Sequence, residues 1–558
     1  MQCRLDRLAG GRNAAADRVD FESVQIRVVG CLFLAFTLSG ATASGQAPEA
    51  RLGPPAPRVT SRIVEVSVVA EDKQGRPVAD LQAEELVLSD GGRPERIVSF
   101  SAQPLPSPAA AALPPGTFTN RLDRLAGGSP SVTAILFDGL NTPMARQSYA
   151  RHQVLTFLRQ VEPGSTMALY TLGRGLKLLQ DLTRDPQPLV RALEQYRGEL
   201  SPEPGVARLD TAGTGLERFG SWLDELDTNL IEHYARDRAL RTLRALVAIA
   251  NHLEKVPGRK NLVWVSGSFP VWIGRDRVPL PRRPDPGEQG LEPEIDRVAR
   301  ALNGAGLAVY PVDARGLMAP ADYEPERASI SREMQLVSRS GFAAMDTLAE
   351  RTGGKAFYND NDLGRAFRRA VDDSRVAYRL GYQPSHDEWN GKFREIRIAA
   401  NRPGVRLRHR RGYFAQPDEP GDDWYRSGVL GAAMWNPTDA TRLGLTVRPF
   451  PAAPDTLDLE IRVDARDVSL RPVEDGWRGQ LDVWLVQLGP GDELLDTVSH
   501  VAGLSLDRPT FDRVMQSGEV PLSERLKRDP KAVLLRVLVR DVGSGALGSV
   551  SIPLSPSR

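Results

Sequence analysis

The sequence has almost no cysteine. The chain is 558 residues long and contains two cysteines, Cys3 and Cys31, both close to the N-terminus. Removal of a leader containing both would leave a chain without cysteine. Such a chain can form no disulfide, has no thiol nucleophile and cannot bind a metal through cysteine.

An excess of charge of one sign is also missing. The 72 Lys and Arg residues balance the 71 Asp and Glu residues, which leaves a net charge of +1. Nothing in this balance favours nucleic acid or acidic lipid, so we predict no nucleic-acid partner. Histidine is scarce, and the six histidines lack metal-ligand spacing: His152, His233, His252, His386, His409 and His500.

Common enzyme motifs are absent as well. The chain has no Gly-Lys-Ser/Thr phosphate loop, no zinc-protease helix motif and no Gly-x-Ser-x-Gly elbow. Gly543–Gly548 matches the dinucleotide-binding pattern in its letters, but strand-like residues 549–552 follow it. That motif requires a helix in this place, so we predict a hairpin turn instead.

A single apolar run is long enough to suggest targeting. Val28–Leu38 follows Arg27 and precedes small residues that include Ala41-Thr42-Ala43. This pattern predicts a signal peptide, and the run is short for a membrane span. We therefore expect a secreted or periplasmic protein with no membrane span after cleavage. An uncleaved anchor is the alternative.

The clearest feature that is present is a buried strand ending in an acid. Ser131–Phe137 is apolar and partly β-branched, Asp138 follows it, and Thr142-Pro143 precedes a predicted helix over Met144–Val161. Thr142 is the predicted N-cap, with Pro143 at the first helical position. Open α/β sheets bind ligands at such strand ends.

Strands and helices alternate after this point. Further buried strands are predicted at Asn261–Val265 and Leu307–Val312, the latter ending at Asp313, and a periodic helix at Ala235–Leu253. The pattern predicts an α/β fold with a doubly wound, mainly parallel sheet, together with β-sandwich domains in the flanking segments.

Composition and pattern predict the following division: signal peptide (1–45), linker (46–59), N-terminal β-sandwich segment (60–103), Pro/Ala-rich linker (104–127), α/β domain (128–376), β segment completing the first sandwich (377–415), linker (416–440) and C-terminal β-sandwich (441–558).

Several stretches carry a resemblance to a known family. They are VVAEDKQGRPVADLQAEELVLSDGGRPERIVSF, AILFDGLNT, PGRKNLVWVSGSFP, LAVYPVDARG, YRLGYQP and GKFREIRIAANRPGVRLRHRRGYFA. Together they cover most of residues 60–415 and resemble the bacterial secreted VWFA-related domain proteins, whose α/β part is similar to a von Willebrand factor A (Rossmann-like) domain. The resemblance implies protein–protein adhesion or scaffolding, sometimes through a bound divalent metal.

The resemblance also implies a metal-ligand pattern, which this chain matches only in part. Von Willebrand A domains that bind metal use Asp-x-Ser-x-Ser, a Thr and an Asp from three loops. Here the first motif supplies Asp138 and Thr142, with Asn141 as a further oxygen ligand for Mg²⁺ or Mn²⁺, whereas Leu140 cannot ligate. The alternative is that Asp138 caps the following helix.

Other residues would complete or border this site. The loop Thr could be Thr211, Thr214 or Thr228, and the predicted ligand rim consists of Ser266, Ser268 and Asp313. The predicted cofactor is therefore either none or a divalent cation.

A cationic stretch lies near the C-terminal end of the predicted first sandwich and consists of Arg406, Arg408, His409, Arg410 and Arg411. It would bind an anionic partner or, as we favour, protect an edge strand against aggregation by its charge.

Taken together, the residues predict a non-enzymatic adhesion or scaffold protein. They identify neither its protein partner nor its oligomeric state. One alternative is a cell-envelope hydrolase or surface-processing enzyme with a site in the loops Gly198–Thr228 or Pro270–Gly290. Another is a structural envelope component without a dedicated ligand.

Overall fold

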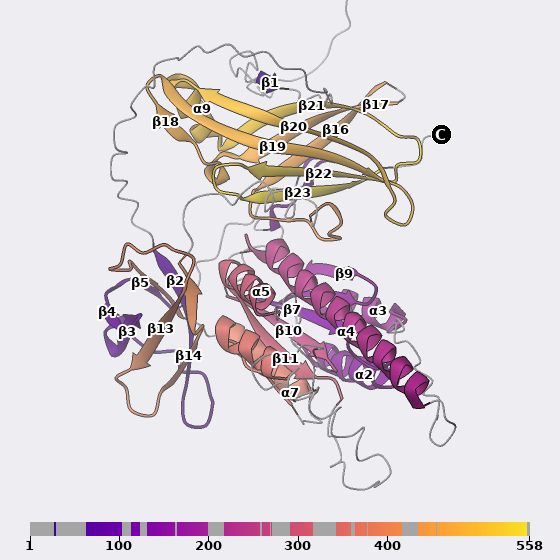
Figure 1. Cartoon of the computed structure of the whole chain (residues 1–558). Coiled ribbons are helices and arrows are strands. Elements are labelled where there is room, and N and C mark those ends of the chain that lie inside the picture. The colour runs from indigo at the N-terminus through magenta and orange to yellow at the C-terminus, as the bar shows by residue number, and fades with distance from the viewer. Residues whose placement is uncertain are drawn as a thin grey trace, which may run out of the picture.

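The computed structural model shows three folded units (Figure 1). It describes residues 27–29, 63–102, 113–122, 131–161, 165–198, 217–256, 259–267, 269, 291–315, 342–358, 363–375, 378–415, 433–453 and 455–554.

The central unit is built on a five-stranded sheet in the order β11-β10-β7-β8-β9. Its strands are β7 (Ser131–Asp138), β8 (Thr166–Leu172), β9 (Leu176–Thr183), β10 (Arg259–Ser266) and β11 (Leu307–Asp313). β11, β10, β7 and β8 run parallel, and β9 returns antiparallel to β8. The sheet is therefore mainly parallel.

Helices cover both faces of this sheet. Alternate residues of β7 point to opposite sides, so Leu136 joins one apolar cluster and Phe137 the other. The first face packs against α4 (Glu217–Leu253), α5 (Glu292–Gly304) and a helix over residues 342–352. The second packs against α2 (Met144–Gln160), α3 (Pro186–Gln195) and α7 (Leu363–Arg375).

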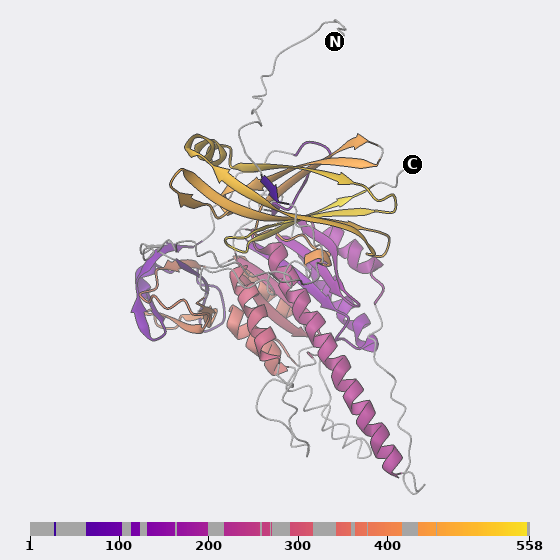
Figure 2. The same ribbon diagram turned by 45° about the horizontal axis from the view of Figure 1, so that its top comes forward.

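Two helix starts differ from the predictions. α4 begins at Glu217, well before the predicted Ala235, and Figure 2 shows its N-terminal half extending beyond the rest of the unit. The apolar periodicity marks the part of α4 that packs on the sheet, because only packed residues need to be apolar. In α2 the N-cap is Pro143, since the Thr142 side chain is used elsewhere.

The first flanking unit combines strands from two distant parts of the chain. One sheet has the order β14-β2-β12-β5 and the other β15-β13-β3-β4. The strands are β2 (Val64–Glu71), β3 (Leu86–Asp90), β4 (Arg93–Glu95), β5 (Ile97–Ser101), β12 (Tyr378–Tyr382), β13 (Phe393–Ala400), β14 (Arg406–His409) and β15 (Gly412–Phe414).

A buried acid joins the two parts of this unit. The carboxylate of Asp90 accepts hydrogen bonds from the hydroxyls of Tyr382 (3.0 Å) and Tyr413 (2.8 Å) and from Arg394 Nε (3.1 Å). The cationic stretch Arg406–Arg411 joins two strands that pair in different sheets, β14 with β2 and β15 with β13.

The C-terminal unit also has two sheets, β1-β20-β19-β22-β23, with β18 beside β19, and β21-β17-β16-β6. Its strands are β16 (Leu445–Ala453), β17 (Thr456–Asp464), β18 (Arg471–Val473), β19 (Gly476–Leu488), β20 (Leu494–Leu506), β21 (Glu519–Lys527), β22 (Leu534–Asp541) and β23 (Leu547–Pro553). The helix α9 (Arg508–Ser517) interrupts the predicted all-β pattern.

Two short strands from segments that were predicted as a linker and as a signal peptide also join this unit. Within the predicted linker 104–127, β6 (Phe118–Thr119) pairs with β16. Within the predicted signal peptide, β1 (Arg27–Val29) pairs with β20.

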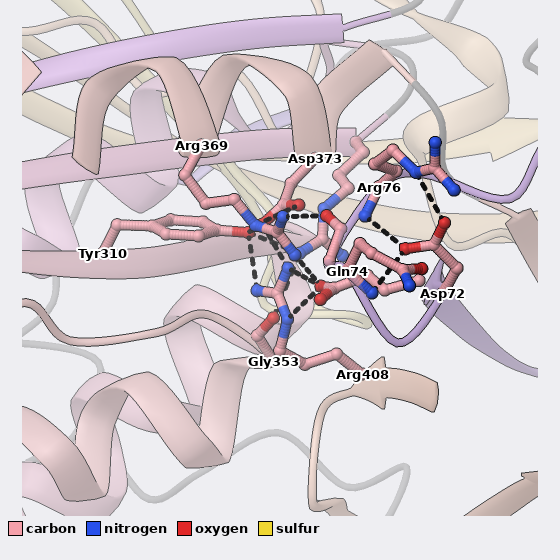
Figure 3. A network of polar contacts seen from close by, with 11 residues as sticks. Asp72, Gln74, Arg76, Tyr310, Gly353, Arg369, Asp373 and Arg408 are labelled. Atoms are coloured by element: carbon pink, nitrogen blue, oxygen red, sulfur yellow. Dashed lines mark hydrogen bonds and ion pairs between the residues drawn. The ribbon is translucent and has the colours of Figure 1, made fainter. Parts of the chain in front are cut away.

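An ionic cluster joins the first flanking unit to the α/β unit (Figure 3). Arg408 of β14 forms ion pairs with Glu71 of β2 (2.9 Å) and with Asp373 of α7. Tyr310 of β11 donates a hydrogen bond to the same Asp373 carboxylate (2.7 Å), and Arg369 pairs with Glu71. β14 lies at the edge of its sheet, as expected for a strand protected by charge. The Arg408 side chain, however, points toward the α/β unit, where it pairs with the buried carboxylate of Asp373.

Candidate functional site

The candidate site lies where three parallel strands end together. Ser266 at the end of β10 is in register with Asp138 of β7 on one side and with Asp313 of β11 on the other. The chain passes from β7 to β8 on one side and later returns to β10 on the other. This change of direction makes the β7/β10 edge the topological switch point, the usual ligand position in open α/β sheets.

The Asp138 carboxylate is fully buried and accepts four hydrogen bonds. Its Oδ1 accepts from the backbone N–H of Asn141 (3.0 Å). Its Oδ2 accepts from Asn141 Nδ2 (2.8 Å), from the indole Nε1 of Trp264 (3.0 Å) and from the Ser266 hydroxyl (2.9 Å). The carboxylate thus holds the β7–α2 loop against β10.

Burial raises the pKa of Asp138, and the hydrogen bonds from Asn141, Trp264 and Ser266 counteract only part of that rise. The charged form is costly at full burial, because a buried ion loses its hydration. The four hydrogen-bond donors offset part of the free-energy cost of burying this carboxylate.

Asn141 links the strand ends to α4. Its Nδ2 also donates to the Thr242 hydroxyl (2.8 Å), which itself donates to the backbone oxygen of Arg238 (2.9 Å). Asn141 Oδ1 is buried and has no hydrogen-bond partner in the part of the chain described. The amide is therefore oriented with its nitrogen toward the acid.

Thr142 bridges the two loops at this edge. Its hydroxyl donates to the backbone oxygen of Asp138 (2.6 Å) and accepts from the Gly267 N–H (2.9 Å). A Cβ on Gly267 would lie 2.9 Å from the backbone oxygen of Asn141, so the close approach requires glycine here.

Asp313 is engaged separately from the Asp138 group. Its Oδ1 accepts from Arg315 Nε and its Oδ2 from Arg315 Nη2, at 3.0 and 3.1 Å. The structure thus brings Asp138, Asn141, Thr142 and Ser266 into one hydrogen-bonded group and places Asp313 beside it.

Several predicted residues fall outside the description. Ser268, Thr211, Thr214 and the loop 270–290 lie outside the described residues. Thr228 belongs to α4, but the position of its side chain is not described. The loop predicted over 198–228 is partly helical, because α4 begins at Glu217.

The described side-chain contacts of the Asp138 carboxylate are hydrogen bonds from donors. A cation needs oxygen lone pairs directed at it, whereas the Trp264 and Asn141 nitrogens point N–H groups at the carboxylate. Leu140, at the position of the middle hydroxyl, is buried and apolar. Across the described ranges, no three His, Cys, Asp or Glu side chains are grouped to hold a metal ion.

Two members of the group, Trp264 and Thr242, are absent from the sequence prediction. Trp264 lies two residues before Ser266 on β10, so both side chains share one face of the strand. This two-residue spacing in the sequence could have identified Trp264 as a neighbour of the site. Nothing local marks Thr242, because helix periodicity does not say which threonine meets a strand end.

Comparisons with known proteins find no match among protein-family models or curated proteins. Solved structures do match. An aerotolerance-related membrane protein from Bacteroides fragilis is 14% identical, with 43% of this chain and 98% of that chain covered and a TM-score of 0.24. A von Willebrand factor type A protein from Catenulispora acidiphila is 9% identical, with 82% and 73% covered and a TM-score of 0.23.

A third match is the vWF domain of a type V pilus tip protein from Porphyromonas gingivalis. It is 10% identical, with 44% of this chain and 94% of that chain covered and a TM-score of 0.25. Von Willebrand A domains are thus among the matched structures. The fold rests on the strand order and hydrogen bonding described above. Of the helices described, none has the length and apolarity to span a membrane.

Proposed function

We propose that the protein is an exported, non-enzymatic adhesion or scaffold protein that binds a protein partner at the strand-end edge of its α/β unit. The observation that carries the proposal is the alignment of Asp138, Ser266 and Asp313 at the carboxyl ends of three parallel strands, with the switch point between β7 and β10. Ligands of open α/β sheets bind at this position.

In this proposal the buried polar group positions the binding face. Asp138, Asn141 and Thr142 hold the β7–α2 loop through buried hydrogen bonds, and Ser266 and Asp313 complete the floor of the face. The loop ends at Met144, a residue that is 46% exposed. A partner would contact the residues around this loop by shape and side-chain chemistry, without a cation.

A photo-crosslinking experiment tests the proposal. A photoreactive amino acid replaces Met144 at the strand-end edge in one variant, and the exposed Gly304 at the opposite edge in another. Each purified full chain is irradiated with an envelope extract of the producing organism. We expect a discrete adduct from position 144 and none from position 304. Equal adducts at both positions, or an adduct at 304 alone, would place the binding face elsewhere.

A further inference from the structure

A cavity of about 510 Å³ lies where the first flanking unit meets the α/β unit. Its walls include Glu71 and the Gly75 turn after β2, residues 355–358, and Arg365 and Arg369 of α7. The size is that of a small-ligand pocket, and such pockets favour junctions between domains. Its lining residue Phe357 adjoins Asp313, whereas none of Asp138, Asn141, Thr142 and Ser266 lines the cavity.

The charge of the lining is predominantly positive. Of the described lining residues, Lys355, Arg365 and Arg369 are cationic and Glu71 is anionic. Glu71 already forms ion pairs with Arg369 and with Arg408. Lys355 and Arg365 are exposed. An acidic group entering the cavity would therefore meet a net positive field.

An aromatic surface lies beside the cations. The Lys355 ammonium is 5.6 Å from the centre of the Phe357 ring, within the range of a cation–π contact. This contact holds the ammonium at the cavity wall. Phe357 is half-buried and is part of the lining, so an apolar group can rest against it while a carboxylate reaches Lys355.

The backbone of residues 356–358 favours an extended peptide over a small anion. Phe357 pairs with β11, since its N–H donates to Pro311 O (2.8 Å) and its oxygen accepts from Asp313 N–H (2.9 Å). Peptide groups of alternate residues in an extended chain point in opposite directions. An added strand could therefore bond to the peptide groups that alternate with those of Phe357.

We propose that this cavity receives an acidic, extended segment of the partner protein, with a Glu or Asp carboxylate at Lys355 and Arg365 and a neighbouring apolar side chain on Phe357. The proposal rests on the protein-binding function proposed above and states the chemistry of the partner segment.

Fluorescence anisotropy on the full chain tests this inference. The probe is a short labelled peptide of alternating glutamate and valine, and its glutamine counterpart is the neutral control. We expect saturable binding of the acidic peptide only. Lys355→Gln and Arg365→Gln should each weaken it by about fivefold, and Lys355→Glu by more, since each removes an attractive charge at a partly screened site.

A matched variant separates this site from general attraction. Lys531→Gln makes the same charge change at an exposed lysine of the C-terminal unit and should leave the affinity unchanged. If Lys531→Gln weakens binding as much as Lys355→Gln, or if the acidic peptide does not bind, the inference is overturned. Binding of free citrate or phosphate alone, lost in Lys355→Gln, would assign the cavity to a small anion and overturn it too.

Failure here is distinguishable from failure of the proposed function. Crosslinking from position 144 reports on the strand-end edge and does not depend on Lys355. A positive crosslink with no peptide binding would retain the protein-binding function and reject this cavity as the partner's docking site.

Discussion

The surroundings of Asp138 determine what that residue can bind. A carboxylate at the end of a buried strand needs partners for its lone pairs, and these can be a cation or N–H and O–H donors. Here Trp264, Ser266 and Asn141 supply the donors. Because all three of these side-chain hydrogens are directed at Oδ2, a cation bound at that oxygen would have to displace at least one of the donors.

The first prediction follows from that occupation. Titration of Mg²⁺ and Mn²⁺ into the chain, followed by calorimetry, should show no saturable binding that depends on Asp138. The variant Asp138→Ala should differ only in stability, losing about 3 kcal/mol because four buried donors lose their acceptor. Saturable binding that disappears in Asp138→Ala would show that the loop rearranges around a metal.

The second prediction concerns the indole. Trp264→Phe keeps most of the ring's bulk but removes the donor to Asp138, so the free energy of unfolding should fall by about 2 kcal/mol, as for a lost hydrogen bond to a charged group. Trp484→Phe, on β19 of the C-terminal unit, is the matched control. Chemical denaturation measures both, and equal losses would mean that the Trp264 hydrogen bond contributes little.

At the scale of elements, β14 shows how one strand joins two units. It pairs with β2 through its backbone, while the Arg408 side chain reaches Asp373 on α7. The Asp373 side chain is only 2% exposed. Removal of the guanidinium would leave this acid buried with fewer partners, which costs more than the ion pair contributes when it is intact.

The third prediction is that Arg408→Ala lowers the free energy of unfolding by about 3 kcal/mol, within the range for breaking a buried pair. Hydrogen exchange should rise in β14 and at the C-terminal end of α7. Arg406→Ala is the matched control, since Arg406 lies two residues earlier on the same strand and is exposed. If the two variants are alike, the ionic cluster does not hold the units together.

At the scale of the whole molecule, His252 connects the α/β unit to the C-terminal unit. It lies near the end of α4, with one ring nitrogen 2.9 Å from the backbone oxygen of Asp439 and the other 3.3 Å from Asp181 Oδ1. Both partners are acceptors, which favours the doubly protonated imidazolium. Burial lowers the pKa of His252, but Asp181 and Asp439 outweigh that effect and the net shift is upward.

The fourth prediction follows from the sign of this shift. A histidine with a raised folded-state pKa stabilises the protein fully below its unfolded pKa of about 6.5 and loses that contribution as pH rises through the folded value. Thermal unfolding should therefore show a stability loss as pH rises above the unfolded value of about 6.5. His252→Gln should remove this loss, whereas His152→Gln, at an exposed site on α2, should keep it. An unchanged pH profile in His252→Gln would argue against the imidazolium.

The shift at Asp181 acts at the other end of the pH range. Burial raises its pKa, but His252 outweighs this and the net pKa is lowered. Its contribution is present above the unfolded value and is lost as pH falls through the folded one. The joint between the two units is thus predicted to be tightest between these two limits.

The sequence by itself determined most of the local elements of the α/β unit and the strand ends at which its candidate site lies. Apolar runs ending at Asp138 and Asp313 predicted β7 and β11, and the spacing of strands and helices predicted a mainly parallel sheet. These features depend on neighbours in the chain, since burial of one face sets the period of apolar residues.

Only the tertiary structure decided what each polar side chain meets. Trp264 and Thr242 reach the Asp138 group from positions more than one hundred residues away along the chain. Arg408 was predicted to protect a strand edge by its charge, but it pairs with the buried Asp373, which lies on a separate element of the fold. A buried polar group takes whichever donors or acceptors the packing of distant segments brings within hydrogen-bond reach, and no local pattern of residues specifies that choice.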